Sequence, residues 1–340
     1  MAIVQWIVWI GVLLATADVT AEDLRRYEFS QVHMGVPFRV TLYAPTKAVA
    51  NRAATAAFAR IGKLDGILSD YNRESELMRL CRSAKPGRPV RVSEELFTVL
   101  ARAAVISNRS DGAFDVSVGP LVKLWRRARR RKRLPDPDDL TAAKRAVGYG
   151  AIRMDKKKRT VELLKTGMLL DLGGIAKGYA GDEALKALRK AGVSRVLIDG
   201  GGDIVVGDPP PGKPGWRIGV AKLGAEDGLP SRYFTLKNAA VATSGDAFQA
   251  VEIGGQRYSH IVDPKTGVGL TIRSSVTVVA RDGMTADVLA SAVSVLGRCG
   301  GAGLMAKFPG TGVSIVVIES GIVREYAFGK RLSGGVEPPE

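Results

Sequence analysis

The segment from residue 169 to residue 199 constrains the fold of this chain more than any other feature. Residues 169–172 form a short apolar run, residues 175–191 show the apolar spacing of a helix, and residues 195–199 form a second apolar run. Glycines fill the loops that follow both runs. The pattern predicts a β-loop-α-β unit with glycine-rich loops at the ends of its strands.

The rest of the chain also mixes predicted strands and helices. We expect a strand or hairpin over 28–45, helices over 47–68 and 93–107, several short strands between 216 and 279, a helix over 284–297, and two strands around 313–326. A length of 340 residues fits two ordinary domains or one large one. The 46% hydrophobic content, with 40 glycines that show no repeating period, excludes collagen, a mostly disordered chain and a polytopic membrane protein.

The first residues resemble a secretory leader. Residues 2–15 are apolar with Gln5 as the one strongly polar interruption, and small residues suited to cleavage follow. The positively charged start of such leaders is missing, because the first Lys or Arg is Arg25. We predict that residues 1–21 are a signal peptide or a retained N-terminal anchor. The protein would then be periplasmic or attached to the outer face of the cytoplasmic membrane.

Positive charge is concentrated in two short segments. The net charge is +16, and residues 121–133 hold eight basic and no acidic residues, while residues 153–159 hold five basic residues and one acidic. Such segments suit an acidic partner protein, an anionic membrane surface or nucleic acid, with a merely solvated surface as the plain alternative. We expect no nucleic acid partner, because aromatic residues other than Trp125 are absent from 121–133 and exported proteins rarely meet nucleic acid. Residues 129–138 include two prolines and are predicted to form an exposed basic loop.

The two cysteines give no sign of a metal site. Cys81 and Cys299 lie far apart, without His or Cys at metal-site spacing around them. We expect two buried thiols. A single disulfide stays open at this point, because the sequence does not fix the distance between the two Cα atoms.

Several loops carry candidate functional residues, and the first of them has the features of a phosphate site. Residues 171–178 (DLGGIAKG) offer backbone N–H groups and the side chain of Lys177 where a strand runs into a helix. Residues 199–203 (DGGGD) bring two carboxylates to the end of the next strand. Residues 258–267 (YSHIVDPKTG) include His260, one of two histidines in the chain. Each loop has a bland interpretation as a turn, and a lone histidine is more often structural than catalytic.

One helix carries a pair of oxygen ligands. Asp287 and Ser291 are four residues apart, so they lie on one face of the predicted helix and can offer a carboxylate and a hydroxyl to the same hard cation. Such ligands suit Mg²⁺. Taken alone, a pair of this kind is more often part of a solvated helix face.

Taken together and in order, the motifs resemble those of the FAD:protein FMN transferase (ApbE-like flavin transferase) family. The resemblance spans about residues 28–300. It rests on Met34-Gly35, SDYN at 69–72, SEL at 75–77, GAFDV at 112–116, GPL at 119–121, DLGGIAKGYA, IDGGGDI, ATSGD at 242–246, YSHIVDPKTG and TADVLASAVSVLG.

The resemblance implies an FAD site and a metal site. The implied FAD contacts are Met34, Tyr71, Ala113, Phe114, Asp115, Asp171, Lys177 and the backbone near Ile261. The implied Mg²⁺ ligands are the carbonyl of Gly174, Asp287 and the hydroxyl of Ser291, and Mn²⁺ is hard enough for the same set. The family usually has Thr at the last position, so this chain keeps the hydroxyl and loses a methyl group. Considered singly, Tyr71 and Phe114 would be interpreted as core aromatics and Asp115 as a helix cap.

The resemblance also implies a reaction. The family transfers the FMN half of FAD to a Thr or Ser hydroxyl of a partner redox protein and releases AMP, which requires in-line attack and a cation on the pyrophosphate oxygens. We assign proton removal to His260, because histidine titrates nearest neutrality, and a phosphate or ribose contact to Lys177. Asp199 and Asp203 are candidates for supporting roles. A metal-dependent FAD pyrophosphatase that yields FMN and AMP, and an FAD-binding protein without turnover, remain as alternatives.

The implied architecture is an α+β, T-fold-like catalytic unit over 28–330. It would consist of two closely packed subdomains with mixed or antiparallel sheets and flanking helices. FAD would lie in the cleft between the subdomains.

Overall fold

The computed structural model describes residues 24–223, 230, 232–245, 250–329 and 336–337. The predicted leader at 1–21 lies outside these ranges. So do Asp246 and residues 247–248, at and after the end of the ATSGD motif.

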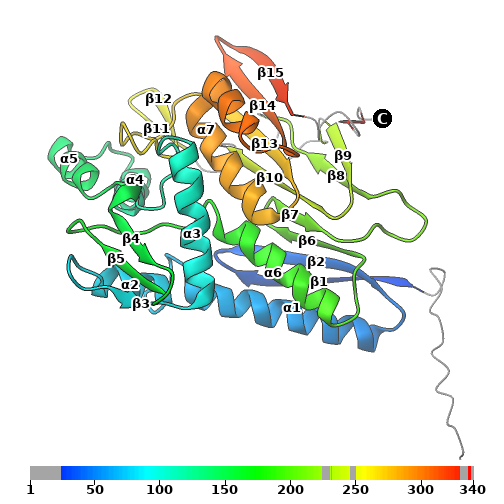
Figure 1. Ribbon diagram of the computed structural model, residues 1–340. Coiled ribbons are helices and arrows are strands. Elements are labelled where there is room, and N and C mark those ends of the chain that lie inside the picture. The colour runs from blue at the N-terminus through cyan, green and yellow to red at the C-terminus, as the bar shows by residue number, and fades with distance from the viewer. Residues whose placement is uncertain (1–23, 224–229, 231, 246–249, 330–335, 338–340) are drawn as a thin grey trace, which may run out of the picture.

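An eight-stranded sheet forms the frame of the molecule, and its strand order is β1-β2-β6-β7-β10-β13-β14-β15 (Figure 1). Each pair of neighbouring strands in it is antiparallel. The strands are β1 (Arg25–His33), β2 (Val36–Ala44), β6 (Val196–Gly200), β7 (Asp203–Val206), β10 (Ala239–Gly245), β13 (Ser274–Ala280), β14 (Gly312–Glu319) and β15 (Ile322–Phe328). The expected hairpin over 28–45 and the two strands around 313–326 are therefore confirmed.

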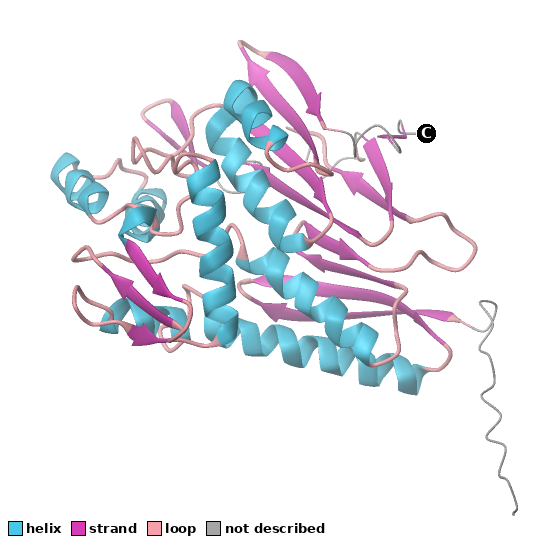
Figure 2. Cartoon of the chain, in the orientation of Figure 1, coloured by secondary structure: helices cyan, strands magenta, loops and turns pink. Residues whose placement is uncertain are grey.

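Helices cover one face of this sheet (Figures 1 and 2), and a smaller sheet packs on the other face. Helices α1 (Lys47–Leu68), α6 (Ala176–Lys190) and α7 (Gly283–Ala306) pack on the first face. Strands β8 (Trp216–Val220), β9 (Arg232–Leu236) and β16 (Val336–Glu337) form the smaller sheet, and β8 and β9 close a second core. Successive side chains of the central strands point to opposite faces of the sheet. In β7, Val205 faces the helices and Val206 faces β8 and β9.

A further group of elements lies beside the helical layer (Figure 1). It contains α2 (Glu76–Ser83), α3 (Glu94–Arg109) and a small antiparallel sheet of β3 (Val90–Arg91), β5 (Thr160–Leu163) and β4 (Ile152–Asp155). A short 3₁₀ helix at Tyr149–Ala151 leads directly into β4. Helices α4 (Gly119–Arg131) and α5 (Pro137–Arg145) and the hairpin β11 (Ala250–Ile253) to β12 (Gln256–Ser259) complete it. The overall arrangement is the α+β fold with antiparallel sheets and flanking helices that the sequence predicted.

Helix starts follow from local side-chain caps. The Oγ of Ser93 accepts a hydrogen bond from the N–H of Leu96 at the start of α3, and an Asp282 carboxylate oxygen accepts one from the N–H of Thr285 at the start of α7. Each bond satisfies one of the backbone donors that a helix leaves unpaired. The predicted helices over 47–68, 93–107 and 175–191 match α1, α3 and α6, and the one over 284–297 continues as α7 to Ala306 past a non-helical residue, Gly297.

The prediction of a β-loop-α-β unit is wrong in its first strand. Residues 169–172 form no strand, and only Leu169 pairs, in an isolated parallel bridge with Val118. The segment is held instead by single contacts, such as the hydrogen bond from the N–H of Asp171 to the carbonyl of Val116. A short apolar run therefore marked a buried connection into α6, which periodicity alone does not distinguish from a strand.

The predicted basic loop over 129–138 is wrong at both ends. Helix α4 continues to Arg131, and α5 begins at Pro137, which leaves a connection of five residues. Arginine is a good helix former, and proline is favoured in the first turn of a helix, so both signals were consistent with helix. The two cysteines are unbridged. Cys81 is half-buried and Cys299 is exposed, so the expectation of two buried thiols is wrong.

Helix α7 is long and apolar enough to cross a membrane by length and composition alone. Half of its most apolar stretch is buried inside the fold, where it packs against β10 and β13. These are the properties of a core helix.

The close crossing of α6 and α7 depends on glycine. A Cβ atom on Gly178 would overlap the carbonyl oxygen of Gly283, and one on Gly283 would lie 2.5 Å from the carbonyl oxygen of Gly178. We expect Gly178→Ala to lower the free energy of unfolding by about 1–3 kcal/mol or more, because the two helices would be forced apart. Gly303→Ala on the exposed side of α7 is the matched control, since nothing lies within 4 Å of its added methyl group. Thermal unfolding of both variants checks this, and equal melting temperatures would contradict it.

Candidate functional site

The implied metal ligands meet where α7 faces the loop before α6. A Cβ atom on Gly174 would lie 2.7 Å from the Oγ of Ser291, so this loop and the helix are in direct contact. One turn earlier on α7, a carboxylate oxygen of Asp287 accepts a hydrogen bond of 3.1 Å from the N–H of Gly178. The structure therefore places Gly174 against Ser291 and Asp287 one turn away on the same helix, and their binding of a cation stays a prediction.

A carboxylate on α6 fixes the start of α7. The two oxygens of Asp182 accept hydrogen bonds from the N–H groups of Gly283 and Met284, at 2.6 and 2.9 Å. Burial raises the pKa of Asp182 to about 7 despite these hydrogen bonds. This contact fixes the position of α7 along its axis relative to α6. It thereby fixes where Asp287 and Ser291 lie relative to the loop at Gly174.

Lys177 is paired with buried carboxylates. Its ammonium group forms an ion pair with Asp203 and lies 3.9 Å from Asp287. Burial and the neighbouring Asp203 raise the pKa of Asp287 to about 7, while the two carboxylates raise the pKa of Lys177 further above its ordinary value against the effect of burial. In this structure the ammonium group of Lys177 therefore neutralises charge on Asp203 and Asp287. Its contact with FAD stays a prediction.

The donor set fits a hard divalent cation. Among the residues that the structure describes, no three His, Cys, Asp or Glu side chains gather as ligands, so a cation would depend on one carboxylate, one hydroxyl and a backbone carbonyl. Asp287 is 4% exposed, and burial raises its pKa because the ionised carboxylate is poorly solvated there. A bound cation would stabilise that ionised carboxylate. Oxygen ligands of this kind suit Mg²⁺ or Mn²⁺.

A second cluster surrounds the guanidinium group of Arg126. Its Nη1 lies 2.5 Å from an oxygen of Asp70 and its Nη2 lies 3.2 Å from an oxygen of Asp171. The guanidinium carbon lies 4.4 Å from the centre of the Tyr71 ring. Two of these residues, Tyr71 and Asp171, are predicted FAD contacts. The Tyr71 side chain is 67% exposed, so its interpretation as a core aromatic is wrong.

The predicted FAD contacts at 113–115 are buried. Ala113 and Phe114 are less than 10% exposed, and Phe114 belongs to the main core. One oxygen of Asp115 accepts hydrogen bonds from the N–H and the Oγ of Ser117, and the other accepts one from the N–H of Tyr149. The Asp115 carboxylate thus organises the loop that precedes α4, and contact of these three residues with FAD stays a prediction.

Met34 lies in the turn between β1 and β2. It has a left-handed backbone, with φ of 50°, and its N–H donates a hydrogen bond of 3.0 Å to a carboxylate oxygen of Asp65 on α1. Asp65 therefore holds the predicted FAD contact at the edge of the helical layer.

His260 and Ile261 begin a loop that returns to the sheet. The N–H of Ile261 donates to the Oγ of Ser259 at 3.1 Å, and its carbonyl accepts from the N–H of Leu270 at 2.9 Å. Trp125 of α4 donates its indole N–H to the carbonyl of Gly267 at 2.8 Å, so α4 supports this loop. His260 is half-buried.

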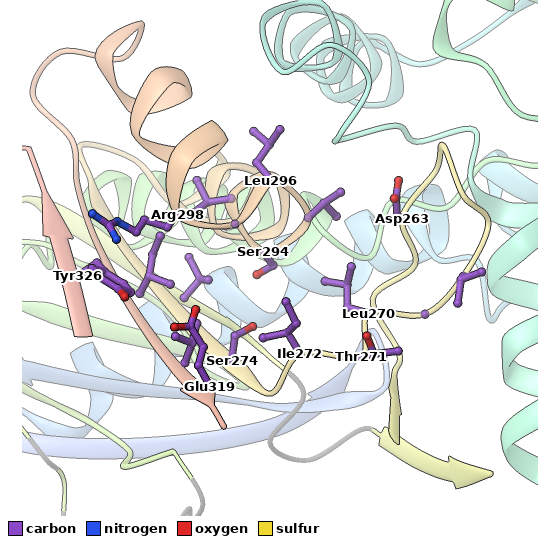
Figure 3. A pocket seen from close by; sticks show the side chains of 18 of the residues that line it. Asp263, Leu270, Thr271, Ile272, Ser274, Ser294, Leu296, Arg298, Glu319 and Tyr326 are labelled. Carbon is purple, nitrogen blue, oxygen red and sulfur yellow. The ribbon is translucent and has the colours of Figure 1, made fainter. Parts of the chain in front are cut away.

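A cavity of about 390 Å³ opens between this loop and the second half of α7 (Figure 3). Apolar side chains such as Leu270, Ile272 and Leu296 line it, and Ser294 points into it one turn beyond Ser291. Arg298 and Glu319 lie at its side. The cavity therefore lies along the part of α7 that follows Ser291, and none of the three proposed metal ligands lines it.

Sequence analysis missed three participants. It gave no role to Asp70 or Arg126, and it did not pair Asp203 with Lys177. Only Arg126 had a signal that could have found it: residues 122, 126, 129 and 133 are spaced at helical intervals beside the buried positions 121, 125 and 128. Asp70 lies on the loop after α1 and Asp203 is the first residue of β7, and no local pattern connects either carboxylate with its cationic partner.

Comparisons with known proteins identify the family of this chain. A family model described as the ApbE family matches residues 34–315. An FAD:protein FMN transferase of Klebsiella pneumoniae is 34% identical over 278 residues, which cover 81% of this chain and 84% of that protein. An FAD:protein FMN transferase of Vibrio cholerae is 30% identical over 306 residues, which cover 86% of this chain and 88% of that protein.

Solved structures are similar over most of their length. The flavin transferase ApbE from Vibrio cholerae matches with a TM-score of 0.83 at 28% identity, and the match covers 92% of this chain and 99% of that chain. The ApbE protein from Thermotoga maritima matches with a TM-score of 0.78 at 30% identity, over 88% of this chain and 96% of that one.

Proposed function

Because this chain belongs to the ApbE family and is a transferase of the FAD:protein FMN transferase type, we propose that it moves FMN from FAD to a Thr or Ser hydroxyl of a partner redox protein and releases AMP. The observation that carries this proposal is the meeting of Asp287 and Ser291 of α7 with the loop at Gly174, directly beside the buried pair of Lys177 and Asp203.

The reaction is a phosphoryl-group transfer. The hydroxyl oxygen of the acceptor forms a bond to the phosphorus atom of the FMN half, and the bond from that phosphorus to the bridging oxygen breaks. AMP leaves with the electron pair, and the hydroxyl proton passes to His260, which lies on the loop beside the cavity. The chemistry that bound Mg²⁺ supplies is neutralisation of the charge that develops on the pyrophosphate oxygens.

The other side chains prepare the site. Gly174, Asp287 and Ser291 would hold the cation. The positive charge of Lys177 offsets the repulsion between the two buried carboxylates of Asp203 and Asp287. Asp171 and Tyr71 would hold the nucleotide. Leu270 and Leu296 give the cavity beside the loop of His260 an apolar wall.

Formation of AMP from FAD tests the metal-dependent part of this proposal. We expect AMP to form in the presence of Mg²⁺ and an acceptor domain, to stop when EDTA is added, and to resume when excess Mg²⁺ or Mn²⁺ is restored. AMP formation that EDTA does not change would overturn the metal assignment. AMP that appears equally fast without any acceptor, together with free FMN, would favour the pyrophosphatase.

Removal of the proposed base gives a further prediction. We expect His260→Gln to reduce the maximal rate of FMN transfer about a hundredfold, the typical contribution of a positioned general base, with little change in FAD affinity. Because a base acts on the acceptor hydroxyl, the loss should shrink as the pH rises and the hydroxyl is more easily deprotonated. Single-turnover rates across pH measure this, and a variant with an unchanged maximal rate would remove His260 from the reaction.

We also propose that the basic face of α4 docks an acidic acceptor. Residues 70–168 hold 24 basic and 12 acidic residues, which is most of the net charge of the chain. Arg127, Arg130 and Arg131 are exposed on α4, whose first turn packs against Leu169 beside the site. A partner drawn to this face would arrive next to Arg126 and Tyr71. An anionic membrane surface is the other candidate for the same face.

Charge reversal on α4 separates these cases. We expect Arg127→Glu/Arg130→Glu/Arg131→Glu to lower the kcat/KM for the acceptor about tenfold at low salt and to remove most of its salt dependence, because steering by surface charge is screened. Lys156→Glu/Lys157→Glu/Lys158→Glu carries the same charge change on the exposed turn after β4 and is the matched control. Equal losses in both variants would contradict docking at α4. Loss of binding to phosphatidylglycerol vesicles without change in kcat/KM would assign the face to lipid.

A further inference from the structure

Arg126 stands apart from the other basic residues of its helix. It lies within the run of eight basic residues at 121–133, yet its side chain is only 25% exposed, and it bridges Asp70 and Asp171, whose side chains are each 12% exposed. A guanidinium fork that binds two different carboxylates at 2.5 and 3.2 Å is held in one orientation. Removal of such a group would leave two partly buried carboxylates facing each other.

The same guanidinium group covers one face of an exposed aromatic ring. Tyr71 is predominantly exposed, and the guanidinium carbon of Arg126 lies 4.4 Å from its ring centre. An exposed tyrosine on a loop is ordinarily mobile, and a cation over one face restrains it. The opposite face of the ring then remains available to a planar ligand.

Arg126 therefore joins three separate segments. Asp70 and Tyr71 lie on the loop after α1, Asp171 lies on the loop before α6, and Arg126 itself lies on α4. The carboxylate of Asp171 is further fixed because its other oxygen accepts a hydrogen bond of 2.9 Å from the N–H of Gly173.

We propose that Arg126 is the positioning residue of the flavin nucleotide site, which holds the ring of Tyr71 as a stacking surface and fixes Asp171 as a hydrogen-bond acceptor for FAD. The proposal rests on the proposed function, because it takes Tyr71 and Asp171 as FAD contacts. Arg126 affects FAD only by holding these two side chains in place. This requires the two-pronged shape of the guanidinium group, so that a positive charge of another shape at the same position would not be sufficient.

The proposal also predicts how FAD binding depends on pH. Burial and the nearby Asp70 raise the pKa of Asp171 to about 6, while Arg126 and the N–H of Gly173 oppose the rise. Tyr71 and Arg129 are the other titratable groups that face Arg126. Ionised Asp171 accepts hydrogen bonds from FAD, so affinity falls as the pH drops through its pKa. Without Arg126 that pKa rises, and the loss of affinity begins at a higher pH.

The test is FAD binding, which needs neither acceptor nor turnover. FAD is titrated into the full chain across pH, and the difference spectrum of the flavin in the visible range is recorded for the wild type and for Arg126→Gln, Arg126→Lys and Arg127→Gln. Arg127→Gln is the matched control, since it removes the same charge from an exposed position on the same helix. The double variant Arg126→Gln/Asp70→Asn avoids two facing carboxylates and keeps the net charge, in case the single variant folds poorly.

We expect FAD affinity to fall about tenfold or more in both Arg126 single variants and in the double variant, the size of effect that a lost charge-assisted contact produces. The difference spectrum due to stacking should weaken, and in Arg126→Gln the midpoint of the pH dependence should move upward. Arg127→Gln should bind as the wild type does. Full rescue by lysine, or an unchanged spectrum and midpoint in folded Arg126→Gln, would overturn the proposal. A wild type that does not bind FAD would instead refute the proposed function.

Discussion

Asp287→Asn is expected to reduce FMN transfer about a thousandfold, because it removes the one carboxylate among the proposed cation ligands. Asparagine keeps the shape of the side chain and an oxygen that can accept the hydrogen bond from the N–H of Gly178. The fold should therefore survive, while the affinity for Mg²⁺ and the rate both fall. Stopped assays of AMP formation at several Mg²⁺ concentrations measure the two effects separately.

The control for this variant lies one turn beyond Ser291 on the same helix. Ser294 donates its hydroxyl to the carbonyl of Ala290 and points into the cavity, so Ser294→Ala changes a hydroxyl of α7 that is not a proposed ligand. We expect transfer close to that of the wild type from Ser294→Ala. An Asp287→Asn variant that retained full Mg²⁺-dependent activity would show that the cation is held elsewhere.

Lys177→Met is expected to have the largest effect on stability. It leaves Asp203 and Asp287 buried without their cation, and breaking a buried pair by removing one partner costs about 3–5 kcal/mol. The cost depends on pH in a defined direction. The folded-state pKa of Asp287 already lies near 7, above its unfolded value, and rises further without the ammonium group. The variant should therefore be closest to the wild type at low pH and lose stability as the pH rises.

Chemical denaturation of Lys177→Met at about pH 5 and pH 8 measures this difference. The double variant Lys177→Met/Asp203→Asn is the matched control, because it removes the partner carboxylate as well and should recover part of the lost stability. Equal stability of the wild type and Lys177→Met at pH 8 would mean that the ion pair contributes little. Measured together with the single variant Asp203→Asn, these two variants form a double-mutant cycle that gives the interaction energy between Lys177 and Asp203.

The parts of the fold that the sequence predicted well are those with long periodic patterns. Helix α1 has the predicted bounds, because apolar spacing continues without interruption from 47 to 68 and proline is absent. The pair of Asp287 and Ser291 was recoverable for the same reason, since a spacing of four fixes a shared helix face wherever the helix lies. The short run at 169–172 failed because four residues do not carry enough pattern to distinguish a strand from a buried connection.

The electrostatic contacts of the site could not be predicted in the same way. Arg126 lies 56 residues after Asp70 and 45 before Asp171 in the sequence, and their meeting depends on how α4 packs beside the loops. The basic run also concealed the difference between Arg126 and its exposed neighbours, because residue type alone says nothing about burial. The ion pair of Lys177 with Asp203 was concealed similarly, since the pattern of 171–178 favoured an interpretation as a phosphate contact.

One measurement tests the central claim most directly. The full chain is incubated with FAD, Mg²⁺ and a redox-protein domain that carries an exposed Thr, and the mass of the acceptor is followed together with the amounts of AMP and free FMN. We expect the acceptor to gain the mass of one FMN phosphoester with an equal amount of AMP, and we expect both products to disappear in Asp287→Asn. AMP and free FMN in equal amounts, with no adduct on any Thr or Ser domain tested, would contradict the transfer reaction.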